Sequence, residues 1–82
     1  MSKFEKLVER FLSKPKDFTY NELIKLLKGF VYIEIQGAGS RVVFRNEEIK
    51  HSIKLHKPHP GTILKRYQID LITEELKGKD LL

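Results

Sequence analysis

The sequence predicts an α+β domain of order ααβββα, with helices packed on one face of a three-stranded antiparallel sheet. Apolar residues recur at helical spacing in two early segments and in one late segment. Between these segments, the chain alternates apolar and polar side chains and is interrupted by two turn-forming stretches. At 82 residues, we expect residues 1–82 to form a single domain.

The first two predicted helices carry apolar stripes and end at residues that stop helices. Residues 3–13 form the first stripe, and Pro15 prevents the helix from continuing. The second helix follows Thr19, which forms a capping-box pattern with Glu22. Gly29 is a typical helix C-terminus, so we expect a helix of about ten residues before it.

The middle of the chain predicts three short strands. Residues 31–36 alternate and are rich in β-branched side chains, and residues 40–45 return after a turn at 37–39. A second turn at 46–48 leads to a strand that begins at 49 or 50 and ends at 55 or 56. This periodicity predicts a meander with one apolar and one cationic face.

A loop and a final helix complete the predicted fold. Residues 57–61 contain two prolines and a glycine, which predict an irregular segment. The last helix begins between Thr62 and Gln68, runs to about Lys77 and ends at Gly78. The predicted core contains Phe4, Leu7, Phe11, Leu23, Leu27, Ile33, Phe44, Ile53, Leu55 and Ile72.

The composition excludes several functional classes. Without cysteine, the chain has no disulfide, no thiolate nucleophile and no sulfur ligand for zinc. The histidines lack nearby carboxylates and there is no phosphate-loop motif, so we expect no metal and no cofactor. No stretch approaches the roughly 20 apolar residues of a membrane span. The N-terminus lacks a secretory pattern, so we expect a cytoplasmic protein without membrane contact.

Positive charge lies on the first two-thirds of the chain, which includes the predicted strands and the loop that follows them. The formal net charge is +5, and residues 31–66 carry seven basic against three acidic side chains. A basic small domain favours polyanionic partners, nucleic acid first. The alternative is that many small domains are mildly basic without a specific partner.

All three histidines lie near the predicted loop. His59 lies between two prolines, which suits a general acid or base, although it could equally be a surface histidine that caps a carbonyl. His56 shares a predicted sheet face with Lys54 and Arg41, and neighbouring cations favour the neutral imidazole that a base requires. The alternative for His56 is an exposed residue at a strand end. His51 shares the apolar face, which indicates a structural role.

Cationic side chains around these histidines are candidates for binding phosphate. An arginine fork holds phosphate oxygens and stabilises charge that develops in a transition state. Each cation could also be an ordinary solvated side chain, and Ser40 more readily fixes a turn than acts as a nucleophile. The candidate RNA-binding or phosphate-binding residues are Ser40, Arg41, Arg45, Lys54, Lys57 and Lys65.

Two motifs, GSRVVFR at 39–45 and HPGTILK at 59–65, resemble those of the HicA toxins. The resemblance extends over residues 19–76 and implies a fold like that of double-stranded-RNA-binding domains. It implies a toxin of a type II toxin–antitoxin module, a metal-independent mRNA endonuclease that a HicB-type antitoxin covers. The family commonly has its catalytic histidine where this chain has Arg41.

The arginine at this position leaves three interpretations open. In the first, His59 and His56 are catalytic and help the ribose 2′-hydroxyl attack its own phosphate. In the second, the chain is an RNA-binding module without catalysis. In the third, it is a protein-interaction domain whose basic face binds an acidic partner.

Overall fold

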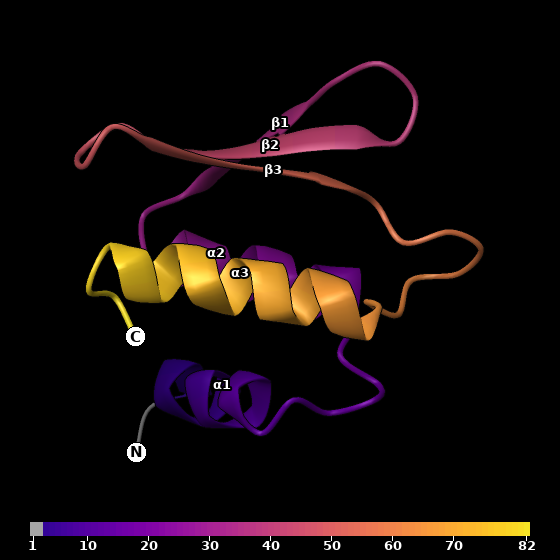
Figure 1. Cartoon of the computed structure of the whole chain (residues 1–82), viewed down its shortest axis with the longest axis horizontal. Helices are drawn as coiled ribbons and strands as arrows, with labels where there is room; N and C mark the ends of the chain where they lie inside the picture. Colours follow the sequence, from indigo (N-terminus) through magenta and orange to yellow (C-terminus); the bar gives the residue numbers. More distant parts are fainter. Residues whose placement is uncertain (1–2) are drawn as a thin grey trace.

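A computed structural model describes residues 3–82 and confirms the α+β class. The sheet forms one layer, α2 and α3 cover one of its faces, and α1 packs below them on the side away from the sheet (Figure 1). The elements are α1 (Lys3–Leu12), α2 (Tyr20–Gly29), β1 (Ile33–Gln36), β2 (Arg41–Asn46), β3 (His51–His56) and α3 (Arg66–Gly78).

The sheet is an antiparallel meander with β2 at its centre and the strand order β1-β2-β3. Side chains on β2 alternate strictly, because successive residues of a strand point to opposite faces. Val42 and Phe44 are buried against the helices, whereas Arg41, Val43 and Arg45 lie on the opposite side. We call this helix-free side the open face.

The predicted place of Ile33 in the core is wrong. Its side chain is 59% exposed on the open face, while the neighbouring Tyr32 is 1% exposed and packs under the helices. The alternation is as predicted, but the buried face is the opposite one: Tyr32 is buried, and the β-branched residues Val31, Ile33 and Ile35 are exposed. Among the other predicted core residues, Phe4 and Leu7 are half-buried against the core, and the following are buried: Phe11, Leu23, Leu27, Phe44, Ile53, Leu55 and Ile72.

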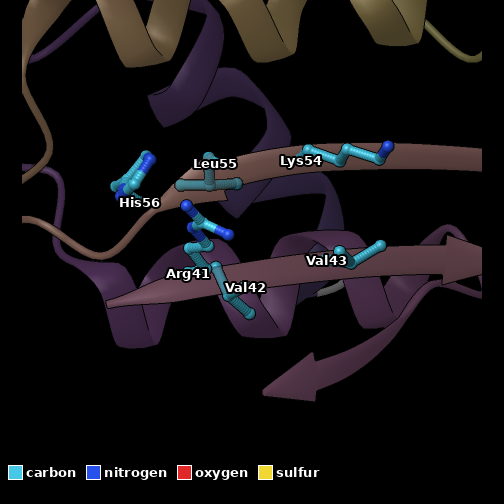
Figure 2. Close-up of a pocket in the computed structure, with 6 residues that line it drawn as sticks. All are labelled: Arg41, Val42, Val43, Lys54, Leu55 and His56. Atoms are coloured by element: carbon cyan, nitrogen blue, oxygen red, sulfur yellow. The ribbon is translucent and has the colours of Figure 1, made fainter. Parts of the chain in front are cut away.

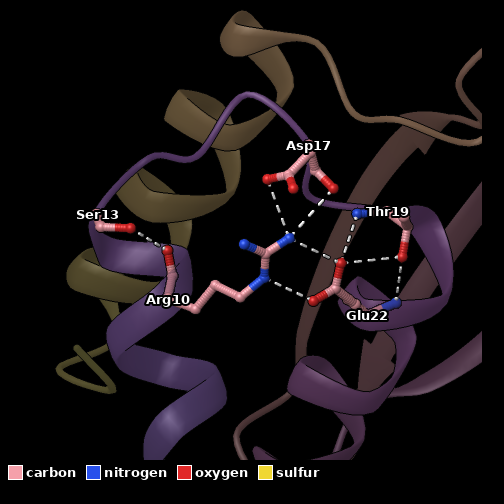
Figure 3. Close-up of polar contacts among 5 residues, drawn as sticks. All are labelled: Arg10, Ser13, Asp17, Thr19 and Glu22. Atoms are coloured by element: carbon pink, nitrogen blue, oxygen red, sulfur yellow. Dashed lines mark hydrogen bonds and ion pairs between the residues drawn. The ribbon is translucent and has the colours of Figure 1, made fainter.

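A polar cluster joins α1 to the start of α2 (Figure 3). Thr19 and Glu22 form the predicted capping box, and the Arg10 guanidinium donates to the Glu22 carboxylate at 2.7 Å. Arg10 also donates to Asp17 at 3.1 Å and lies over the Phe18 ring. The arginine contact lowers the pKa of Glu22 to about 2, so this carboxylate stays charged at ordinary pH.

We predict that Glu22→Gln lowers stability by about 1 kcal/mol at neutral pH, because glutamine keeps the capping geometry but removes the charge. The Glu22 pKa is depressed in the folded state, so its contribution is complete above about 4.5 and is lost as pH falls towards 2. Thermal unfolding of both proteins from pH 7 to pH 2 should show their difference vanish over this window. A difference that is independent of pH would contradict the prediction.

Candidate nucleic-acid interface

The end of the β2–β3 hairpin brings a guanidinium and an imidazole together on the open face. Arg41 lies directly opposite His56 in the strand register. The backbone of Lys57 donates to the Ser40 carbonyl at 2.8 Å, so the next pair along, Arg41 with His56, does not exchange backbone hydrogen bonds. Side chains of such pairs approach more closely than those of hydrogen-bonded pairs. Register alone therefore places these two groups side by side.

One nitrogen of the His56 ring, Nδ1, has a hydrogen-bond partner. Its Nδ1 lies 3.2 Å from Ser40 Oγ, in the turn that precedes β2. A serine hydroxyl can accept as well as donate, so when Ser40 accepts the Nδ1 proton, Nε2 presents a lone pair to solvent. The side chain is exposed, and this arrangement leaves one ring nitrogen available to a ligand.

A shallow hollow of about 410 Å³ lies around this pair. Arg41 and Lys54 both line it, and neither has an ion-pair partner among residues 3–82. Arg45 lies farther along the same face, but it is bound to Glu47 and Ser52, each at 2.9 Å. The cations available to an anion at this hollow are therefore Arg41 and Lys54. Figure 2 shows its lining residues: Arg41, Val42, Val43, Lys54, Leu55 and His56.

The segment between β3 and α3 contains the predicted site residues Lys57, His59 and Lys65, and backbone hydrogen bonds anchor it near both ends. Lys57 pairs with Ser40, and the Thr62 carbonyl accepts from the Tyr20 amide at 2.7 Å. The loop protrudes beyond the end of the sheet (Figure 1). His59 is exposed in this loop and has no partner within the described chain, and Lys65 is exposed at the start of α3. Within residues 3–82, no hydrogen bond or ion pair joins either side chain to His56.

A buried glutamine, which the sequence did not single out, connects the site to α3. Gln68 is 3% exposed, and its amide donates to the His56 carbonyl at 2.7 Å. Its carbonyl oxygen accepts from the Lys65 amide at 2.9 Å. One side chain thus fixes both the end of β3 and the beginning of α3. It holds the backbone that carries His56.

His51 has the structural role that its apolar strand face predicted. Its Nδ1 lies 2.6 Å from the Tyr32 hydroxyl, and its Nε2 lies 2.7 Å from a Glu75 carboxylate oxygen. Burial, and then the negative charge of Glu75, raise the pKa of Tyr32. Sequence reasoning identified neither partner, because they lie 19 and 24 residues from His51. These bonds join β3 to α3 and to the residue before β1.

Comparison with protein-family models, curated proteins and solved structures finds no match to this chain. Within residues 3–82, no three histidine, aspartate or glutamate side chains are grouped so that they could hold a metal ion. In the same part of the chain, no helix has the length and apolar character needed to cross a bilayer.

We predict that Gln68→Met destabilises the fold by about 1–3 kcal/mol, since it removes the buried side-chain amide that bonds to both the His56 carbonyl and the Lys65 amide. Gln36→Met is the control, because this glutamine is exposed and should tolerate the change within about 0.5 kcal/mol. Urea unfolding of the two variants measures the difference. Equal midpoints would show that Gln68 does not hold this junction.

Proposed function

We propose that this chain binds RNA on the open face of its sheet and cleaves it without a metal, with His56 as the general base. The observation that carries the proposal is the cross-strand pair of Arg41 and His56, beside Lys54, which has no ion-pair partner among residues 3–82. A base next to two free cations is the minimum needed to deprotonate a hydroxyl and hold the phosphate that it attacks.

The chemistry would proceed by internal attack on the RNA backbone. His56 Nε2 takes the proton of the ribose 2′-hydroxyl, and O2′ forms a bond to the adjacent phosphorus. The bond from phosphorus to the 5′ oxygen breaks, and that oxygen takes a proton from water. Arg41 and Lys54 stabilise the negative charge that builds on the phosphoryl oxygens. The products are a 2′,3′-cyclic phosphate and a free 5′-hydroxyl.

The resemblance to HicA toxins supports an assignment of this activity to a type II toxin–antitoxin module. The motif at 39–45 covers most of β2, and the motif at 59–65 lies in the segment between β3 and α3. A hydrogen bond from the Lys57 amide to the Ser40 carbonyl joins the first motif to the start of that segment. On this proposal the natural substrate is mRNA, and a HicB-type antitoxin covers the open face. The fold proposed from the same resemblance is that of a double-stranded-RNA-binding domain, preceded by α1 as an additional helix.

RNA binding without cleavage is the second candidate. Two observations favour it. Arg41 stands where the family commonly has its catalytic histidine, and within the described chain His59 has no hydrogen bond or ion pair with His56, Arg41 or Lys54. A site with one imidazole and two cations binds phosphate whether or not it turns over.

Binding should depend steeply on salt. We predict that the affinity for a structured RNA falls as ionic strength rises, with a log–log slope that becomes shallower by about one for Arg41→Ala or Lys54→Ala. Arg45→Ala should change the slope less, because that guanidinium is already bound to Glu47 and Ser52. Fluorescence anisotropy from 50 to 300 mM salt gives the slopes. An affinity independent of salt would instead favour an acidic protein partner.

Cleavage should depend on one imidazole. We predict that His56→Ala lowers the rate on mRNA by about 10²–10⁴-fold while the protein stays folded, because the base is lost. His59→Ala, the matched loop variant, should cost less, and EDTA should change nothing. Cyclic-phosphate ends, detected by mass spectrometry, would identify the reaction. If the parent protein binds RNA but never cuts it, the second candidate replaces the first.

A further inference from the structure

The outer edge of β1 carries backbone groups without a partner. The Gly37 amide bonds to the Arg41 carbonyl, so by alternation Ile35 and Ile33 also bond towards β2. The N–H and C=O groups of Glu34 and Gln36 therefore point away from the sheet. Among residues 3–82, no other strand pairs with β1 on that side.

Several devices that block strand pairing are absent from this four-residue edge strand, which contains no lysine, proline or bulge. Its open-face side chains are Ile33 and Ile35, 59% and 47% exposed. The opposite edge is different, because β3 carries Lys54 and Gln68 closes its end by bonding to the His56 carbonyl. Of the two edges, β1 is the one suited to receive another strand.

A groove runs beside this edge, between β1 and α2. It has a volume of about 260 Å³. Lys28 lies at its rim, exposed and without an ion-pair partner in the described chain. The one carboxylate in the lining, that of Glu34, is already bound by the Tyr20 hydroxyl. The lining residues are Ile24, Lys28, Tyr32, Ile33, Glu34 and Phe44.

We propose that the β1 edge and this groove bind an extended, acidic segment of a partner protein as a fourth strand of the sheet. The segment's backbone would bond to Glu34 and Gln36, its apolar side chains would lie beside Ile33 and Ile35, and a carboxylate would reach Lys28. This site is separate from the Arg41–His56 pair and does not depend on RNA binding. Acidic side chains are expected on the segment because Lys28 has no ion-pair partner in the described chain.

A second copy of this chain is a poorer occupant. Pairing β1 with β1 about a twofold axis would bring a second Lys28 towards the same groove, where the described lining residues offer no carboxylate other than that of Glu34, already bound by Tyr20. Each copy also carries a net charge of +5, which opposes association. Charge complementarity therefore favours an acidic partner over self-association.

An eight-residue peptide of alternating valine and aspartate tests the proposal on the intact chain. Such a strand puts its valines on one face and its aspartates on the other. We expect saturable binding and slower hydrogen exchange at the Glu34 and Gln36 amides, measured by NMR. Methylating the peptide nitrogens that face β1 should abolish binding, whereas methylating the alternate set should preserve it.

Three variants separate this site from non-specific attraction. Ile35→Lys places a charge on the edge and should abolish binding, while Ile63→Lys, at another exposed isoleucine, should not. Lys28→Glu should weaken binding of the aspartate peptide at least tenfold and favour a valine–lysine peptide instead.

The following results would overturn the proposal. One is unchanged exchange at Glu34 and Gln36 when the peptide is saturating. A second is equal binding of both methylated peptides. A third is a dimer, seen by sedimentation, that dissociates in Ile35→Lys, since it would make a second copy the occupant. Protection of the same two amides by an RNA oligonucleotide would assign the edge to nucleic acid.

Discussion

The strict alternation of side chains along β2 is the constraint on which the rest of the structure depends. Val42 and Phe44 must face the helices, because the sheet has one covered side and these are its central apolar contacts. Once they are buried, Arg41 and Arg45 have to lie on the open face. The same register then puts His56 opposite Arg41. The candidate site is therefore a consequence of how the core packs.

Polar side chains in the interior hold that register at the sheet's ends. Gln68 bonds to the end of β3, and His51 joins Tyr32 to Glu75 at the other end of the same strand. Burying a polar side chain costs free energy unless its hydrogen bonds are made, and these bonds form in only one arrangement of the helix and the strand. Apolar packing alone would tolerate small sliding of α3 over the sheet. These hydrogen bonds specify one position, and so fix where His56 lies.

The order of elements followed from sequence periodicity, and the capping box followed from a four-residue motif at 19–22. Both signals are local in the sequence. The face of β1 did not, since local hydrophobicity ranks Ile33 above Tyr32, whereas a buried tyrosine also needs a hydrogen-bond partner from distant residues. Gln68 was missed for the same reason. For the site, strand parity put His56 and Arg41 on the same sheet face, and the register that sets them opposite each other came from the structure. No local pattern shows how far a loop residue such as His59 lies from them.

The turn between β2 and β3 has a consequence for how this chain can vary in length. The Asn46 side chain accepts from the Glu48 and Ile49 amides and donates to the Phe30 carbonyl, so this turn is fitted to one length. A single inserted residue would shift β3 by one position and exchange its two faces. The exposed residues 59–61 set no strand register. Insertions and deletions among related chains should therefore collect in that loop and be absent from the turn.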